Sequence, residues 1–301
     1  MWPGRFVMRF DHILIADWSA ASHPTSATRK QDSIWIGEAG PEDSDRCEHH
    51  FRTRFDAETW LHARLTELST RRVLLGFDFA FAFPAGFARA LTGQPDPRAV
   101  WRWLADTLTD APDNANNRFA LAASINCLFP AGPGPFWSRP ASWDLPDLPP
   151  RRHGIDYAAH GLTEHRQAEV LTRAKPIWML TNPGAVGSQS LMGQALLSRL
   201  DGPRTAIWPF DPPDRLANAP LVLAEVYPSL LGPLVAQHAR KNEVKDSAQV
   251  RLLAQALANL HRQGQLAPLF AAAPAAALEE GWILGASHAE LLRSAVGHDA
   301  D

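Results

Sequence analysis

The stretch HILIADWSAA, residues 12–21, joins an apolar strand-like run to a carboxylate. The run 13–16 is built from branched and small apolar residues that favour strands. Asp17 follows it directly, ahead of the small residues 19–21. A carboxylate in this position must be solvated, hydrogen-bonded or bound to a cation, because burying an unpaired charge is costly. The stretch therefore predicts a first strand whose end carries a functional acid.

Two later stretches repeat this design. Asp78 follows the apolar run 73–77 in RRVLLGFDFA, and Glu225 follows the run 221–224 in PLVLAEVYPS. Neighbouring strands lie about 4.8 Å apart, so acids at adjacent strand ends come within a few ångströms of one another. We therefore expect Asp17, Asp78 and Glu225 to form one acidic cluster at one edge of a sheet.

Length and composition limit the class of protein. The chain has 301 residues, which suits one large domain or two small ones. Its formal net charge of -3 argues against binding nucleic acid by bulk charge, although a local basic patch stays possible. The two cysteines are too few and too far apart for a disulfide scaffold or a zinc site. Because there is no apolar run of membrane-spanning length and no signal peptide, we expect a cytoplasmic protein without membrane contact.

The predicted elements indicate an α/β fold. Three strands close together in sequence are expected to form an antiparallel meander, followed by a helix and a fourth strand. These elements are strands 10–18, 33–37 and 48–55, helix 56–72 with Asp56 as its N-cap, and strand 73–77. The core pattern resumes late in the chain, with strand 221–226, a helical segment 228–239 and a helix from Asp246 to a stop at Gly264.

A long Pro- and Trp-rich insertion, about residues 92–219, separates the fourth strand from the strand at 221–226. Residues 110–152 lack periodicity, and loops this long are usually functional or mobile. Elsewhere in the insertion we predict helices at 96–108, 160–174 and 188–200, and a short strand at 205–210. The tail, residues 263–301, contains EEGWILG and is expected to dock against the domain.

The element order and four motifs resemble the ribonuclease H-like fold and, within it, a family of uncharacterised predicted RNase H-like nucleases. The motifs are ADWSA around Asp17, GFDFAFAFP around Asp78, EVYPS around Glu225 and KDSAQV around Asp246. EVYPS and KDSAQ are the most specific, and the resemblance covers residues 10–91 and 220–262. It implies an RNase H-like mixed sheet in the order β-β-β-α-β-α-β-α within a domain at residues 10–262. Many relatives carry a further acid one turn into the last helix, where this chain has Gln249.

The predicted site is a divalent-metal site made of four carboxylates. Asp17, Asp78, Glu225 and Asp246 are expected to be both metal ligands and catalytic residues, with Asp17 bridging. Carboxylate oxygens suit Mg²⁺ or Mn²⁺, and paired metal ions neutralise charge and activate water in phosphodiester hydrolysis. The alternative for each acid is a helix cap or turn, and this alternative is strongest for Asp246 at a helix start.

Weaker signals point to residues that could contact a substrate. Lys245 can hold a phosphate or an acid, or be a solvated lysine. Ser19 can contact Asp17 or a phosphate, or form a turn. Arg151 and Arg152 lie in the insertion, which could overhang the acids. Small residues in the segment 182–190 precede a helix, where free N–H groups can bind an anion, although most such turns are simple caps.

These patterns predict a metal-dependent phosphodiester hydrolase, a nuclease of RNase H-like type that acts on a nucleic acid or nucleotide. Two alternatives stay open. One is an actin-like or sugar-kinase-like phosphotransferase, in which a strand-end Asp positions a phosphate or a metal. The other is a non-catalytic or cofactor-biosynthesis-associated protein with a decayed site, which the missing acid near Gln249 favours. The chain has no P-loop motif and no convincing dinucleotide-binding motif.

Overall fold

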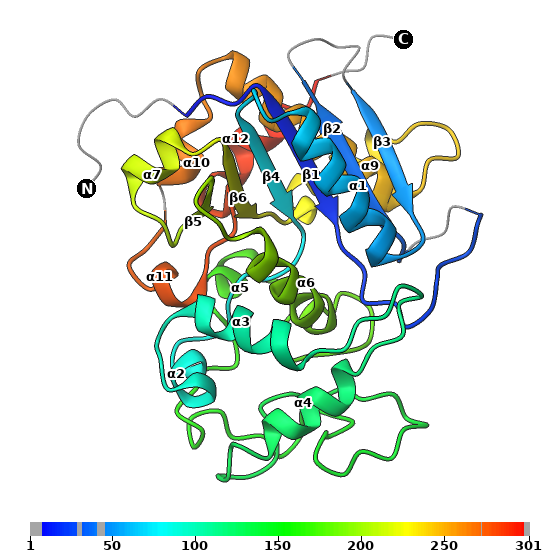
Figure 1. Ribbon diagram of the computed structural model, residues 1–301, viewed down its shortest axis with the longest axis vertical. Coiled ribbons are helices and arrows are strands. Elements are labelled where there is room, and N and C mark those ends of the chain that lie inside the picture. The colour runs from blue at the N-terminus through cyan, green and yellow to red at the C-terminus, as the bar shows by residue number, and fades with distance from the viewer. Residues whose placement is uncertain (1–7, 29–31, 41–45, 272, 298–301) are drawn as a thin grey trace.

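A six-stranded mixed sheet lies at the centre of an α/β structure (Figure 1). The computed structural model describes residues 8–28, 32–40, 46–271 and 273–297. The strand order is β3-β2-β1-β4-β6-β5. β1 pairs antiparallel with β2, and β2 with β3, whereas the pairs β1–β4, β4–β6 and β6–β5 are parallel. The strands are β1 (His12–Asp17), β2 (Ile34–Ala39), β3 (Cys47–Phe51), β4 (Val73–Phe77), β5 (Thr205–Trp208) and β6 (Leu221–Glu225).

Helices lie around the sheet, and further helices in the insertion are connected by long irregular segments (Figure 1). The first six are α1 (Arg54–Glu67), α2 (Phe87–Thr92), α3 (Pro97–Thr107), α4 (Arg118–Asn126), α5 (Gln167–Thr172) and α6 (Gly187–Leu200). The rest are α7 (Pro213–Asn218), η2 (Pro228–Leu231), α8 (Leu234–Gln237), α9 (Lys245–Arg262), α10 (Ala267–Ala271), α11 (Ala277–Glu280), η3 (Ala286–His288) and α12 (Ala289–Ser294). Within the described ranges, every helix falls short of the length or apolarity that a membrane span requires.

Alternation along the strands divides the core between the two faces of the sheet. On one face Leu14, Ala16 and Phe77 pack with residues of α1 and α6. On the other face Ile15 and Ala224 pack with residues of α9 and of the C-terminal segment. The side to which a strand-end residue points therefore decides whether it meets α6 or the start of α9.

The α9 helix lies directly on β2. A side-chain carbon added to Gly37 in β2 would lie 2.5 Å from the backbone carbonyl of Val250 in α9. Only glycine allows this approach, which is far closer than two carbon atoms can pack. The contact brings the first turn of α9 beside the ends of β1 and β4.

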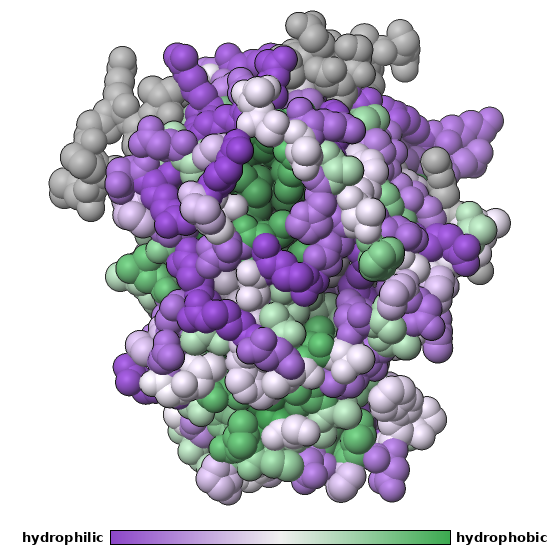
Figure 2. Space-filling view, in the orientation of Figure 1, coloured by the Kyte–Doolittle hydropathy of each residue, from purple (hydrophilic) through white to green (hydrophobic). Residues whose placement is uncertain are grey.

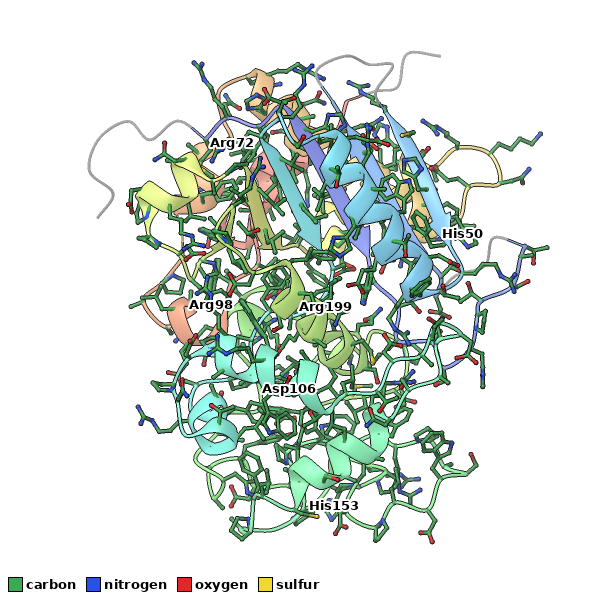
Figure 3. All side chains as sticks on the ribbon, in the orientation of Figure 1. His50, Arg72, Arg98, Asp106, His153 and Arg199 are labelled. Atoms are coloured by element: carbon green, nitrogen blue, oxygen red, sulfur yellow. The ribbon has the colours of Figure 1, made fainter. Side chains whose placement is uncertain are left out.

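The insertion packs as a second layer against the α6 side of the sheet. Its apolar cluster is aromatic and is shared with the segment that follows β4: Trp178 of the insertion, Phe83 and Phe87 are in mutual ring contact. Apolar side chains gather around its lower end, in the region of α4 (Figure 2). Two ion pairs join it to α1: Arg199 of α6 with Glu58, and Asp110 with Arg54. Arg98 of α3 pairs with Asp211 inside the insertion (Figure 3 labels Arg98 and Arg199).

Several local predictions are confirmed and others are corrected. The helix predicted at 96–108 is confirmed as α3, which begins at Pro97 with Asp96 as its N-cap. The N-cap of α1 is Thr53 and not Asp56, because the Thr53 hydroxyl accepts a hydrogen bond from the Asp56 N–H. The helical segment at 228–239 is broken at Gly232, where φ is 58°. The stretch 110–152, expected to be irregular, contains α4, and the short strand predicted at 205–210 joins the sheet as its edge strand β5.

The C-terminal segment adds a short backbone contact to the end of β6. Ile283 forms a parallel bridge with Glu225, and the Leu284 N–H donates to the Glu225 carbonyl over 2.8 Å. Trp282, Ile283 and Leu284 are buried. The tail thus covers the sheet edge at which the predicted acids lie.

Candidate functional site

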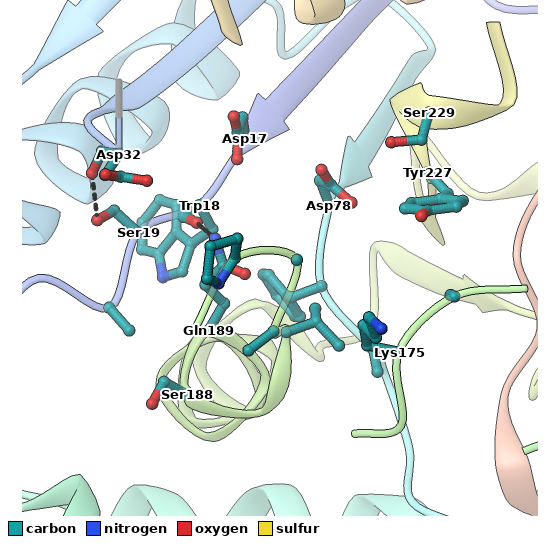
Figure 4. Close-up of a pocket in the computed structure, with 18 of the residues that line it drawn as sticks. Asp17, Trp18, Ser19, Asp32, Asp78, Lys175, Ser188, Gln189, Tyr227 and Ser229 are labelled. Carbon is teal, nitrogen blue, oxygen red and sulfur yellow. Dashed lines mark hydrogen bonds between the residues drawn. The ribbon is translucent and has the colours of Figure 1, made fainter. Parts of the chain in front are cut away.

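A cavity of about 750 Å³ opens at the carboxyl edge of the parallel strands. All four predicted metal ligands line it: Asp17, Asp78, Glu225 and Asp246. Figure 4 shows Asp17 at the end of β1 and Asp78 at the end of β4. The structure thus brings together acids that are up to 229 residues apart in the chain.

The strand register divides these acids between the two faces of the sheet. Ala16 pairs with Phe77, and the Asp78 N–H donates to the Ala16 carbonyl over 2.9 Å, so Asp17 and Asp78 occupy neighbouring positions. By the alternation of side chains along β1 and β4, both aspartates belong to the face of the sheet that packs on α9. Glu225 is opposite Phe77, one position earlier, and therefore belongs to the α6 face.

Burial and mutual repulsion make the ionised form of the two strand-end aspartates unfavourable. Burial, and then the charges of Asp78 and Asp246, raise the pKa of Asp17 well above its usual range. Burial, and then Glu225 and Asp246, raise the pKa of Asp78 to about 7. Carboxylates that repel one another in a partly buried site are relieved by a cation.

Asp246 faces these two acids from the first turn of α9. One of its oxygens accepts a hydrogen bond from the Asp32 N–H over 3.1 Å, which ties the helix to the segment before β2. Burial raises the pKa of Asp246, while this hydrogen bond lowers it in part. A capping role alone does not explain the position of the Asp246 side chain, because this side chain also lines the cavity together with Asp17.

Glu225 is held by a buried arginine. The Arg166 guanidinium donates to both Glu225 oxygens, over 2.7 and 2.8 Å, and the Phe81 N–H donates to one of them over 3.0 Å. Arg166 also pairs with Glu169 over 2.8 Å. All three charged groups are buried. Although burial alone would lower the pKa of Arg166, the charges of Glu225 and Glu169 raise it. These bonds satisfy Glu225 without a metal, and its role as a ligand stays a prediction.

The wall opposite the acids comes from the insertion and carries cations and hydrogen-bond donors. Arg118 of α4 and Lys175 line this wall, as does the start of α6. The Gln189 side chain in α6 donates to the Trp18 carbonyl over 2.8 Å and so ties α6 to the end of β1 (Figure 4). One cavity therefore has an acidic wall and a basic wall.

The residues that sequence analysis proposed as weaker candidates for substrate contact differ in where they lie. Lys245 lines the cavity and is exposed. The Ser19 hydroxyl donates to the Asp32 carbonyl over 2.7 Å and accepts from the Ala21 N–H, which is the turn alternative. Arg151 and Arg152 are exposed and lie outside the cavity wall, and Arg152 pairs with Glu164.

A second group of metal-capable side chains lies between β2 and β3. The carboxylate of Glu38, the thiol of Cys47 and the ring of His49 place one ligand atom each within 4.8 Å of the others. Sequence spacing did not predict this group, although a Cys-x-His pair on a strand puts both side chains on one face. The carboxylate is already satisfied: although burial would raise the pKa of Glu38, hydrogen bonds from His12, His49 and Arg64 lower it far below its usual range.

Sequence analysis missed the three basic residues that shape the cavity. Arg166 and Glu169 are three residues apart on a polar helix, which was the one local signal of an ion pair. Arg118 and Lys175 lie in segments without a motif, and only the fold places them opposite the acids.

Comparison of the chain with protein-family models, with curated proteins and with solved structures finds no match. The function must therefore be argued from the geometry of the cavity.

Proposed function

We propose that the protein is a divalent-metal-dependent phosphodiesterase, a nuclease of RNase H-like type. The observation that carries this proposal is the adjacent placement of Asp17 and Asp78 at two parallel strand ends, facing Asp246 on α9. The order of three antiparallel strands, a helix and then parallel strands supports the RNase H-like assignment, with β5 as an additional edge strand.

The donor set fits a hard divalent cation. Carboxylate oxygens are the ligands that Mg²⁺ and Mn²⁺ prefer, and the raised pKa values of Asp17 and Asp78 show that their charges lack compensation. A bound cation would supply charge neutralisation at the phosphate and an activated water. Asp17, Asp78 and Asp246 would hold it. Arg166 holds the Glu225 side chain beside them through an ion pair.

Metal binding is the first test. Calorimetric titration with Mn²⁺ at pH 8 should show binding by the wild-type protein and at least about a tenfold loss for Asp17→Asn, since a ligand of the cation is removed. Asp106→Asn is the matched control, because Asp106 is an exposed acid on α3 outside the cavity (Figure 3). Equal Mn²⁺ affinity in Asp17→Asn and wild type would contradict the proposed ligand set.

Hydrolysis is the second test. Bis(p-nitrophenyl) phosphate and short labelled oligonucleotides should be cleaved only with Mn²⁺ or Mg²⁺, and Asp17→Asn should reduce the rate at least about 100-fold. Metal binding without turnover on any of these substrates would favour the non-catalytic alternative. Stabilisation by ATP at millimolar concentration would favour the phosphotransferase alternative.

A further inference from the structure

Arg118 is a buried cation whose partners are all neutral. Its guanidinium donates to the hydroxyls of Ser188 and Ser22, over 3.1 and 2.8 Å, and to the side-chain oxygen of Asn116 over 2.7 Å. It also lies 4.3 Å from the centre of the Phe119 ring. Among the described residues none forms an ion pair with it, although its exposed fraction is only 9%. A buried charge without an opposite charge is costly, so this arrangement needs an explanation.

The neighbouring Arg54 shows what a structural arginine looks like in this protein. Its guanidinium makes two hydrogen bonds to the carboxylate of Asp110, over 2.6 and 2.7 Å, and caps three backbone carbonyls. Asp110 is thus engaged by Arg54 and not by Arg118. Burial and then the charge of Arg54 lower the pKa of Arg118 to about 10, which still leaves it charged at neutral pH.

The start of α6 lies against Arg118 and adds further donors. Ser188, the second residue of this 14-residue helix, is the residue to which the Arg118 Nε donates. The helix has no side-chain N-cap. The Gly187 N–H donates to the Met179 carbonyl over 3.1 Å, which leaves the N–H groups of Ser188 and Gln189 as the first-turn donors without a partner inside the helix. Free N–H groups at a helix start favour anions. Residues 184–186 and Gln189 line the same cavity wall.

We propose that Arg118 and the start of α6 form a phosphate subsite that binds the terminal phosphate of a short phosphodiester substrate. Arg presents a planar fork of donors that matches phosphate oxygens. The inference rests on the proposed function for the bond that is cleaved at the acidic wall, but binding of phosphate at the basic wall needs no metal.

The cavity also sets the size of the substrate. A volume of about 750 Å³ is within the range of small-molecule sites and suits a ligand of dinucleotide size. Because the insertion forms the wall that faces the acids, the substrate must lie between the two walls. A 5′- or 3′-phosphorylated dinucleotide would place its phosphodiester at the acids and its terminal phosphate at Arg118.

Binding of inorganic phosphate to the full chain in EDTA tests this subsite without any turnover. Calorimetry or ³¹P line broadening should show binding by the wild type and a loss of about tenfold or more in Arg118→Gln. Arg89→Gln is the matched control, since Arg89 is an exposed arginine outside the cavity. Equal phosphate binding by Arg118→Gln and wild type would overturn the subsite.

A labelling experiment on the wild-type protein removes any dependence on the folding of Arg118→Gln. Phenylglyoxal should modify Arg118, and phosphate should protect it at least about fivefold while Arg89 stays unprotected. Lack of protection would overturn the inference. Phosphate binding that needs Arg118, in a protein whose Asp17→Asn variant binds Mn²⁺ as the wild type does, would keep the subsite and refute only the proposed phosphodiesterase.

Discussion

Replacement of Arg166 by methionine tests the buried ion cluster behind the acids. The change removes four side-chain hydrogen bonds, two to Glu225 and one each to Glu169 and the Glu280 carbonyl. It also leaves Glu225 and Glu169 buried without a cation. Loss of one partner from a buried ion pair costs about 3–5 kcal/mol, because the remaining charge is uncompensated. We expect Arg166→Met to lower the free energy of unfolding by that amount at pH 8.

The pH dependence of this loss identifies its cause. Burial already raises the pKa of Glu169, and Arg166 lowers it in part. In Arg166→Met the pKa of Glu169 in the folded state should therefore rise further, so the folded protein takes up a proton more readily than the unfolded chain. The variant should then lose stability as the pH rises above about 4.3, the ordinary value for Glu. The cost should be largest at pH 7–8 and clearly smaller at pH 5.

Urea denaturation followed by tryptophan fluorescence measures both effects. Arg152→Met is the matched control, because Arg152 also pairs with a glutamate but is exposed. Exposed pairs contribute about 0–1 kcal/mol. An equal loss of stability in Arg166→Met and Arg152→Met, or a loss that is the same at pH 5 and pH 8, would refute this explanation.

In the calorimetric series Glu225→Gln should bind Mn²⁺ with an affinity within about threefold of wild type. A loss of affinity like that of Asp17→Asn would instead make Glu225 a ligand.

Three further predictions concern single positions. Asp78→Asn should raise the free energy of unfolding in EDTA at pH 8 by up to about 4 kcal/mol, because the pKa of Asp78 is raised to about 7. The gain should shrink to below about 1 kcal/mol near pH 4, because there Asp78 is protonated in the folded protein and about half protonated in the unfolded chain. Denaturation at pH 8 and pH 4 measures the change. Gly37→Ala should lower the free energy of unfolding by about 1–3 kcal/mol, because α9 lies directly on β2 at this position. Gly202 has open space around it, so Gly202→Ala should lower the free energy of unfolding far less, and thermal denaturation of both variants measures the difference. Burial and then Glu38 raise the pKa of Cys47 to about 11. The rate of its alkylation by iodoacetamide should therefore rise about tenfold per pH unit between pH 8 and pH 10. An alkylation rate that does not depend on pH would contradict this.

The position of the acids at the carboxyl edge of the sheet could be predicted, because it depends only on the local pattern of residues along the chain. An apolar run ends, an acid follows, and parallel strands present such ends at one edge. The face to which each acid points could not be predicted. Asp78 and Glu225 follow runs that look alike in sequence, but Glu225 lies one register position earlier, and a shift of one position reverses the face. Register depends on packing between distant strands, which no local pattern encodes.

The small residues at 182–190 indicate a possible anion site at the start of α6, but the positions of Arg118 and Arg166 were beyond sequence analysis for a related reason. Arg166 meets Glu225 across 59 residues, and Arg118 meets Ser188 across 70. Both arginines lie in the Pro-rich insertion, where turns interrupt periodicity and left α4 unpredicted. The last strand to join the sheet, β5, was predicted as a short strand, but its place beyond β6 follows only from the complete packing.

The order in which the chain is synthesised has a consequence for when the cavity can form. Asp17 and Asp78 leave the ribosome early, but β6 must still enter the sheet beside β4, and Asp246 arrives only with α9. A nascent chain halted in the insertion holds two of the carboxylates and has no second wall at the sheet edge. Under the proposed function, a divalent cation could therefore be held at this edge, and a phosphodiester cleaved there, only after nearly the whole chain has been synthesised.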